Sequence, residues 1–151
     1  MAGLERAVAD LVVPLDYTYN YRVGQYLERY IKELGNKKIM AVKCPKCGKV
    51  AVPPREICAW CRVKMDEWVE VGPDGTVENF TIAHVWLNKG AVEKIDVPKV
   101  IAMVMLDGAT VPLAAWLEGE AGNVKKGMKV KAVFKEPAGD TLSDLSHFEP
   151  V

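Results

Sequence analysis

Four cysteines are the residues of this chain whose spacing most clearly indicates chemistry. Cys44 and Cys47 form one C-x2-C pair, Cys58 and Cys61 form a second, and the 151 residues contain no other cysteine. Two such pairs can place four thiolates at the corners of a tetrahedron, about 2.3 Å from one zinc ion. Gly48 follows the first pair, where a tight turn often requires positive φ, whereas the second pair lacks this glycine. The pattern predicts a four-cysteine zinc site.

Two disulfides, or unrelated buried thiols, are the alternative interpretation of these cysteines. It is less favoured because a cytosolic chain seldom keeps disulfides, and redox chemistry is less favoured still. A zinc ion held by four thiolates has no open coordination position for water or substrate. We therefore expect one structural zinc ion per chain, whose removal unfolds residues 36–66 first.

Positive charge surrounds the cysteines in the sequence. Residues 36–64 contain eight Lys or Arg and one acidic residue, a local net charge of +7, which zinc and four thiolates would lower to about +5. The basic residues are Lys37, Lys38, Lys43, Lys46, Lys49, Arg55, Arg62 and Lys64. Two interpretations stay open: the cations stabilise thiolate charge, or they form a dock for phosphates or an acidic partner.

Signatures of catalysis are weak elsewhere in the sequence. His84 and His147 fall within predicted strands, with no cysteine outside the metal site to activate, so a structural role is favoured for each. The chain has no glycine-rich nucleotide loop. The acids Asp140, Asp144 and Glu149 resemble a solvated turn more than an acid–base pair. We expect no catalytic residue in this chain.

The elements that would position the metal site begin with a tyrosine-rich segment, residues 1–35. Apolar positions recur there at helical spacing and predict a helix over residues 21–34 that closes at Gly35. A shorter helix is predicted over residues 4–12 and would end before Pro14. Amphipathic tyrosine rings on these helices can pack on their own domain or face another protein, and we interpret residues 1–35 as a helical hook for partner docking.

Residues 36–66 read as the metal ribbon, which is too small to fold without its ion. Residues 67–151 read as short strands separated by Asp107-Gly108, Lys126-Gly127 and other turn signals. The predicted strands are Trp68 to Val71, Thr76 to Leu87, Lys99 to Leu106, Thr110 to Leu117, Met128 to Lys135 and Leu142 to Phe148. The fold class is mainly β with N-terminal α, and a small OB-fold barrel is the leading candidate among small barrels.

Composition excludes several functional classes. Apolar residues make up 50% of the chain and charged residues 26%, as in globular proteins, and the formal net charge is zero. No apolar run approaches the roughly 18 to 20 residues that span a bilayer, and the start of the chain carries acids, unlike a secretion signal. We expect a cytoplasmic protein.

Binding of single-stranded nucleic acid is the alternative function. Trp60, Trp68, Trp86 and Trp116 could stack on bases, as OB-fold aromatics do, although core packing explains them more simply. Residues 71–151 contain eight Lys or Arg against eleven acids, a net charge of −3 that should repel a phosphate backbone. Nucleic acid is therefore not the favoured partner.

The order of these segments resembles the bacterial and archaeal family of zinc-ribbon plus OB-fold acyl-CoA-associated proteins, over roughly residues 15–150. The matching phrases are Cys44-Pro45-Lys46-Cys47-Gly48, Pro53-Pro54-Arg55-Glu56-Ile57-Cys58, Trp68 with Gly75-Thr76-Val77, Lys126-Gly127-Met128-Lys129-Val130, and Leu142 to Phe148. The resemblance implies a rubredoxin-like zinc ribbon followed by the barrel. Residues 1–14 have no matching phrase, so their role is open.

The resemblance also implies a function. Members of that family are similar to scaffolds for thiolase-fold enzymes, so the chain would be a non-catalytic accessory subunit of a thiolase-type acyl-CoA acyltransferase complex. Lys46, Arg55 and Arg62 are our candidates for contacts to the phosphates of coenzyme A, or of an acyl-CoA shared with the partner, or to an acidic partner surface. An independent CoA-dependent enzyme is a third, weaker hypothesis, because no uncommitted thiol nucleophile is present.

Overall fold

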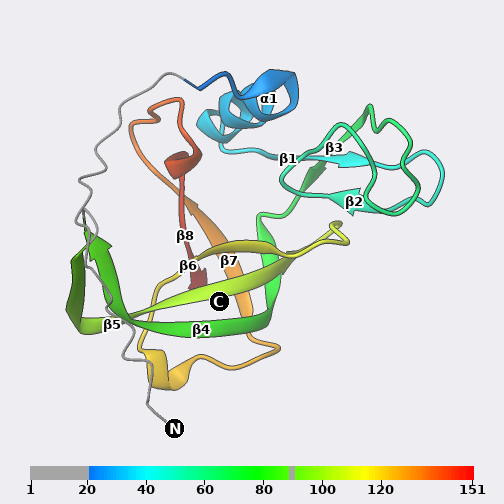
Figure 1. The fold of residues 1–151 in the computed structure, drawn as a ribbon. Coiled ribbons are helices and arrows are strands. Elements are labelled where there is room, and N and C mark those ends of the chain that lie inside the picture. The colour runs from blue at the N-terminus through cyan, green and yellow to red at the C-terminus, as the bar shows by residue number, and fades with distance from the viewer. Residues whose placement is uncertain (1–20, 89–90) are drawn as a thin grey trace, which may run out of the picture.

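The computed structural model describes residues 21–88 and 91–151, in which one helix precedes two small β structures (Figure 1). The helix predicted over residues 4–12 lies outside the described residues. No helix in the described part of the chain combines the length and apolar character needed to cross a membrane.

Helix α1 spans Gly24–Gly35 and confirms the helix predicted over residues 21–34, although it begins three residues later. Its apolar stripe buries Tyr30 and Leu34. At the C-terminal end, the backbone N–H groups of Asn36 and Lys37 donate to the carbonyls of Glu33 and Leu34 at 3.0 and 2.9 Å, which satisfies carbonyls that the helix leaves free.

The next three strands form a small sheet in the order β2-β1-β3. β1 spans Ile39–Lys43, β2 spans Val50–Ala51 and β3 spans Glu67–Val71. β3 pairs with β1 along its whole length, from Ile39↔Val71 to Lys43↔Glu67. The strand that the sequence assigned to the start of the barrel therefore completes the sheet that carries the metal ribbon.

The remaining five strands close a barrel in the order β4-β5-β6-β8-β7. They span Asp74–Asn88 (β4), Ala91–Leu106 (β5), Leu113–Leu117 (β6), Lys129–Phe134 (β7) and Leu145–Pro150 (β8). Short 3-10 turns, Ala121–Asn123 (η1) and Leu142–Asp144 (η2), precede β7 and β8. This five-stranded closed barrel confirms the OB-fold prediction.

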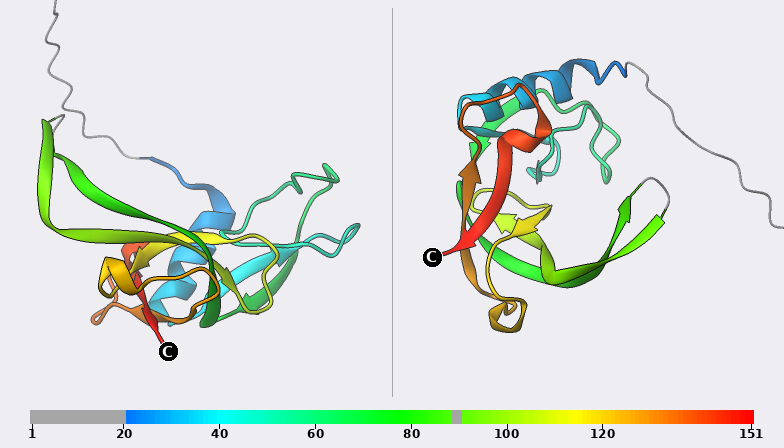
Figure 2. Two further views of the ribbon diagram at one scale, coloured as in Figure 1. Left: turned by 90° about the horizontal axis from the view of Figure 1, so that it is seen from below. Right: turned by 90° about the vertical axis from the view of Figure 1, so that its left-hand side faces the viewer.

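The β4–β5 hairpin extends beyond the barrel (Figure 2). β4 pairs with β7 only over Asp74, Gly75 and Thr76, whereas its pairing with β5 continues to Asn88↔Ala91. The sequence predicted only the barrel part of β5, from Lys99, because residues 91–98 mix charged side chains with a proline. Pairing with the end of β4, which is long-range information, makes these residues a strand.

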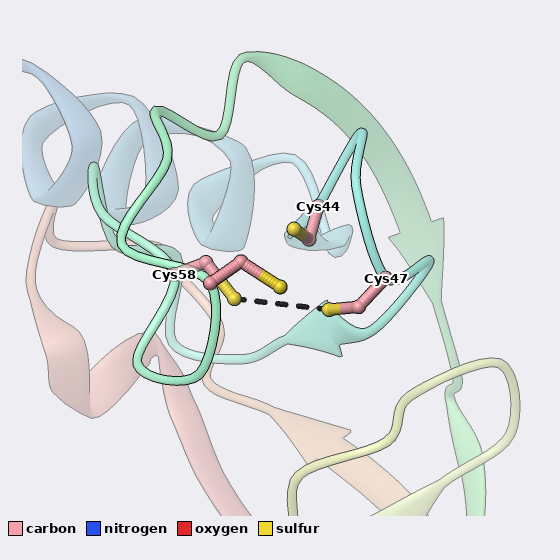
Figure 3. A group of neighbouring side chains, drawn as sticks. Cys44, Cys47 and Cys58 are labelled. Carbon is pink, nitrogen blue, oxygen red and sulfur yellow. Dashed lines mark hydrogen bonds between the residues drawn. The ribbon is translucent and has the colours of Figure 1, made fainter.

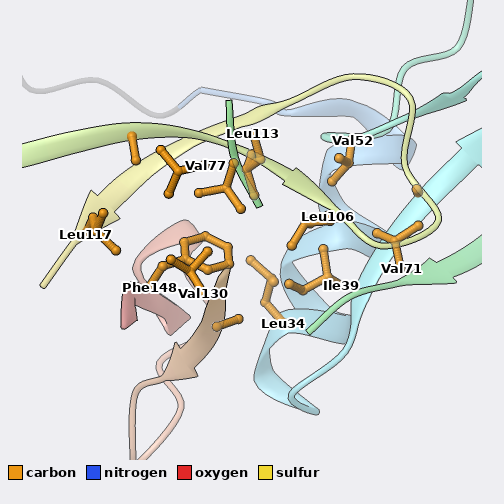
Figure 4. Packing of buried hydrophobic residues seen from close by; sticks show 14 of the residues in the cluster. Leu34, Ile39, Val52, Val71, Val77, Leu106, Leu113, Leu117, Val130 and Phe148 are labelled. Atoms are coloured by element: carbon orange, nitrogen blue, oxygen red, sulfur yellow. The ribbon is translucent and has the colours of Figure 1, made fainter. Parts of the chain in front are cut away.

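One apolar core joins the helix, the ribbon sheet and the barrel (Figure 4). Leu34 of α1, Ile39 of β1 and Val71 of β3 belong to the same buried cluster as Leu106 and Phe148 of the barrel. Thr110 adds a polar link: its hydroxyl accepts from the Val50 N–H at 2.8 Å and donates to the Val50 carbonyl at 3.0 Å. The barrel therefore supports the sheet that positions the metal ribbon.

Candidate metal centre

The four cysteine sulfurs converge at the open end of the ribbon sheet (Figure 3). All four Sγ atoms lie within 4.8 Å of one another, and those of Cys47 and Cys58 are 3.8 Å apart. A tetrahedral zinc ion with bonds of 2.3 Å would hold its sulfurs about 3.8 Å apart. The four thiols are free, with no disulfide among them. Their arrangement fits one four-coordinate metal ion.

The two cysteine pairs lie on turns that repeat the same backbone hydrogen bonds. In the first, the Cys44 N–H donates to the Lys49 carbonyl at 2.8 Å and the Gly48 N–H donates to the Cys44 carbonyl at 2.9 Å. In the second, the Cys58 N–H donates to the Val63 carbonyl at 2.9 Å and the Arg62 N–H donates to the Cys58 carbonyl at 3.0 Å. Each turn thus directs both of its sulfurs toward the other turn.

The residue after each pair adopts a left-handed backbone conformation. Gly48 has φ +71° and Arg62 has φ +56°. The sequence signalled this turn only at Gly48, since glycine reaches positive φ without a steric penalty. The second turn has the same shape with an arginine in the strained position, which sequence spacing alone could not show.

Burial divides the cluster into an inner and an outer half. Cys44 and Cys58 are 1% and 2% exposed and pack in a small second core with Val42, Ala51 and Met65. Cys47 is exposed and Cys61 is half-buried. The neighbouring Cys47 thiol, and then desolvation, raise the pKa of the Cys61 thiol to about 12. A divalent metal would offset this by stabilising the thiolate form.

The eight cations of residues 36–64 fall into three groups. Four of them contact acids: Lys43 with Glu67 at 3.1 Å, Lys64 with Glu56 at 3.8 Å, Lys38 with Glu70 at 4.0 Å, and Lys37 with Glu136. Lys49 lies over the Trp60 ring, 4.7 Å from its centroid.

The candidate residues Lys46, Arg55 and Arg62 have no acidic partner within the described residues. Lys46 lies within the first cysteine turn and Arg62 follows the second, so the convergence of the turns brings their chain segments together. Arg55 is half-buried in the segment that leads to Cys58.

Helix α1 is attached to the ribbon by an aromatic stack that the sequence did not predict. The rings of Tyr26 and Trp68 lie 5.5 Å apart, and the Arg29 guanidinium lies 4.3 Å from the Trp68 centroid. The Tyr26 hydroxyl donates to the Met65 carbonyl at 2.7 Å. The clustering of tyrosines signalled a special surface, but the pairing with Trp68 needed the tertiary fold.

The histidines lie in strands, as predicted: His84 in β4 and His147 in β8. The His147 ring contacts the Ser146 hydroxyl through Nδ1 at 3.0 Å and the Glu118 carboxylate through Nε2 at 2.7 Å. Glu118 is 69% exposed and Ser146 is also exposed. Both partners of the ring are exposed, so these electrostatic contacts are weaker than they would be in a buried site.

Family models match most of the chain. Residues 34–66 match the model described as the ChsH2 rubredoxin-like zinc ribbon domain, and residues 68–135 match the ChsH2 C-terminal OB-fold domain. The two matches meet at residue 67, the first residue of β3. This strand pairs within the ribbon sheet and leads along the chain into the barrel.

Similar proteins agree with these matches. A DUF35 domain-containing scaffold protein of Methanocaldococcus jannaschii is 33% identical over 82% of this chain and 87% of its own length. A DUF35 protein of unknown function from Sulfolobus solfataricus has a crystal structure with a TM-score of 0.63 and 29% identity, covering 84% of each chain.

A structure described as the Ltp2-ChsH2(DUF35) aldolase shares the fold, with a TM-score of 0.63 at 21% identity over 87% of this chain and 98% of that chain. The fold, the two domain matches and the identity to the Methanocaldococcus protein lead to one conclusion. This chain is a member of the DUF35 family, with a rubredoxin-like zinc ribbon joined to an OB-fold barrel.

Proposed function

We propose that the chain is a non-catalytic accessory subunit that scaffolds a thiolase-type acyl-CoA acyltransferase complex. The observation that carries the proposal is the 33% identity, over most of both chains, to a DUF35 protein named as a scaffold. The fold shared with the Ltp2-ChsH2(DUF35) aldolase is in keeping with a role beside an acyl-transferring or carbon–carbon bond-cleaving enzyme. The thiolase-fold partner follows from the family resemblance of the sequence.

The chemistry of the cysteines supports a structural metal. All four thiols of the chain converge on one site, and a zinc ion bound by them would have no position left for substrate. Cys44, Cys47, Cys58 and Cys61 are the proposed ligands. With its thiols committed, the chain would depend on the partner for the nucleophile of acyl transfer.

The three cations without an acidic partner are the proposed contacts to the complex. Lys46, Arg55 and Arg62 would lie against the phosphates of a coenzyme A thioester held by the partner, or against an acidic partner surface. The cations that already contact acids, such as Lys43 and Lys64, are less suited, because their charge is partly neutralised within the chain.

The test is co-expression with the thiolase-fold enzyme whose gene lies nearest to that of this chain, followed by co-purification and acyltransferase assays. We expect a stable complex, and an acyl-CoA KM several-fold higher or a weaker complex when Lys46, Arg55 and Arg62 are all changed to Ala. The matched control changes Lys37, Lys38 and Lys64 to Ala, which removes the same charge from residues paired with acids. Equal effects of the two triple variants would contradict the proposed contacts, and absence of any complex would contradict the scaffold role.

Binding of single-stranded nucleic acid is the second candidate, and one observation favours it. Trp86 of the extended β4–β5 hairpin and Trp116 of β6 lie side by side, with ring centroids 5.9 Å apart, and Lys99 is 5.7 Å from the Trp116 centroid. The net charge of −3 over residues 71–151 opposes it. Salt-dependent binding of an oligothymidylate, lost in Trp86→Ala, would make this candidate the better one.

A further inference from the structure

We infer that the groove between β6 and β8 binds an extended segment of a partner polypeptide, which adds as a strand to the free edge of β6. The inference deepens the proposed function and rests on it only for the identity of the partner. It follows from backbone groups of β6 that no strand of the described residues pairs, and from the apolar walls beside them.

The edge arises because β6 and β8 meet at one end only (Figure 1). β6 pairs with β5 along its whole length but pairs with β8 at a single position, Leu117↔Phe148. Just beyond that position, the Glu118 N–H donates to the Phe148 carbonyl at 2.8 Å, so Glu118 directs its backbone groups toward β8. Backbone direction alternates along a strand, so Ala114 and Trp116 also face the β8 side. The parallel pairing of Leu117 with Phe148 uses the Trp116 carbonyl, so the groups left for a further strand are the Ala114 N–H, the Ala114 carbonyl and the Trp116 N–H. Within the described residues, no strand pairs with β6 there before Leu117.

A groove accompanies this edge. A cavity of about 470 Å³ has one wall formed by β6, including Ala114 and Trp116, and the other formed by η2 and the start of β8, including Leu142 and Leu145. Tyr30 of α1 also lines the cavity. Most of the lining is apolar, and Leu142 is 52% exposed although it is a large apolar side chain.

The groove continues past Trp116. A second cavity of about 470 Å³ shares Trp116 and Ser146 with the first and runs to Val97 and His147. The two cavities together follow β6 from end to end, but β8 occupies the edge of β6 at Leu117 and Glu118. A peptide strand would therefore pair with β6 up to Trp116 and contact only side chains in the second cavity. A strand of five residues spans about 17 Å, so the length available suits an extended peptide better than a compact ligand.

The edge of β6 carries protective residues only next to its two ends. Natural edges are usually short or carry a Lys, a Pro, an inward-pointing charge or a bulge. Pro112 precedes β6 and Glu118 follows it, but the strand itself reads Leu-Ala-Ala-Trp-Leu and pairs regularly with β5. An extended peptide would satisfy the free N–H groups of Ala114 and Trp116 and the free Ala114 carbonyl with its own backbone, and would place alternate apolar side chains along the walls. A lipid or other apolar ligand would leave those backbone groups without partners.

The test begins with the zinc-loaded full chain and a displayed library of random peptides about ten residues long. We expect selection of proline-poor peptides in which apolar residues alternate. A selected peptide, labelled for fluorescence anisotropy, is then the probe. Its binding should slow hydrogen exchange of the Ala114 and Trp116 amides, which face the groove, and leave the β7 amides unchanged.

Two variants test the two parts of the argument. Ala114→Pro removes an N–H that faces away from β5, so the β5–β6 ladder stays intact while strand addition is blocked. Leu142→Glu places a charge in the apolar wall. Each should weaken peptide binding by about tenfold or more, which corresponds to the loss of one good contact. The matched control is Val85→Glu, an apolar residue of similar exposure (49%) that does not line either cavity.

Each outcome decides the inference. Failure to select a peptide, unchanged exchange at Ala114 and Trp116, or equal losses in Leu142→Glu and Val85→Glu would overturn it. If Ala114→Pro does not fold, Leu142→Glu alone decides. A dimer that Leu142→Glu dissociates would assign the groove to a second copy, and faster β6 exchange in a full-length Leu11→Asp/Val12→Asp variant would assign it to the chain's own N-terminal segment. Either result would overturn the inference that the groove binds a segment of a partner protein.

The enzyme complex separates this inference from the proposed function. When the complex with the thiolase-fold enzyme forms, exchange at Ala114 and Trp116 should slow as it does with the peptide. A complex that forms without this slowing overturns the inference and leaves the scaffold role standing. Peptide binding without any enzyme complex supports the groove and contradicts the scaffold role.

Discussion

At the scale of single residues, the two cysteine turns have the same backbone but different residues at their most demanding position. Gly48 and Arg62 both have positive φ, and their N–H groups make equivalent hydrogen bonds. A left-handed conformation costs a residue with a Cβ atom about 1–2 kcal/mol, whereas glycine avoids this cost. Arg62 therefore stores backbone strain beside the metal cluster.

This strain predicts effects of opposite sign in two variants. Gly48→Ala should lower the free energy of unfolding by about 1–2 kcal/mol. A Cβ atom there meets nothing within 4 Å, so the cost comes from φ alone. Arg62→Gly should raise it by up to about 1 kcal/mol, because the relief of strain exceeds the extra chain entropy of glycine. Urea unfolding of the zinc-loaded variants measures both, and destabilisation by both would contradict the explanation.

Asp144 is a second residue whose role depends on its position. The sequence placed it in a solvated turn, and the turn is present as η2, but the prediction of solvation is wrong for Asp144, which is buried and closes a capping box with Thr141. Its carboxylate accepts from the N–H groups of Gly139 at 2.9 Å and Thr141 at 3.2 Å. The Gly139 hydrogen bond, supported by those from Thr141, holds the pKa of Asp144 below its usual value of 3.8 despite burial.

The lowered pKa predicts an acid-sensitive contribution to stability. Since the folded pKa lies below the unfolded one, the stabilisation is complete well above pH 3.8 and is lost as the pH falls toward the folded value. Asp144→Asn should therefore reduce the loss of stability between pH 5 and pH 2, measured by urea unfolding at each pH. Asp107→Asn, at an exposed turn, is the matched control and should leave that loss unchanged. A similar reduction in both variants would show that the loss of folding stability in acid does not depend on the hydrogen bonds of Asp144.

At the scale of elements, α1 positions the ribbon through Tyr26, Trp68 and Arg29. The tyrosine stacks on Trp68 and also donates to the Met65 carbonyl, just before β3. The helical spacing predicted that this helix exists, because amphipathic periodicity is local. It could not predict which residues the helix contacts, since Met65 lies 39 positions away in the chain.

The contribution of this contact can be measured with two tyrosine variants. Tyr26→Phe keeps the aromatic stack but leaves the Met65 carbonyl without its donor, and should cost about 0.5–1.5 kcal/mol in urea unfolding. Tyr21→Phe changes a tyrosine that is 75% exposed and should cost almost nothing. Equal values for the two variants would show that the Tyr26 hydroxyl does not hold the helix to the ribbon.

The strands show the same division between local and long-range information. The predicted barrel strands are found within a few residues of their expected positions, because alternation and turn residues are local signals. The extension of β5 over residues 91–98 and the pairing of β3 with β1 were not predicted. Both depend on partners elsewhere in the chain. The same holds for the groove beside β6, which exists because β8 diverges from it.

At the scale of the whole molecule, the ribbon sheet and the barrel share one apolar core, and the cysteine turns lie outside it. Ile39, Val52 and Val71 are buried in the same core as the barrel residues, whereas the cysteine turns pack in a separate, smaller cluster. The sequence predicted that residues 36–66 unfold first without metal. Because β1 and β3 pack against the barrel, we now expect only the cysteine turns to unfold first when the metal is removed.

Removal of the metal tests this division. After chelation, we expect hydrogen exchange at the Gly48 and Arg62 amides, which bond only within the turns, to become at least about tenfold faster. Amides of β1, β5 and β7 should keep their protection, because the large core does not include the cysteines. Zinc added back should restore the slow exchange, which serves as the control for chelator effects. If the β5 and β7 amides lose protection together with the turns, the metal stabilises the entire fold and the barrel is no independent support for the ribbon.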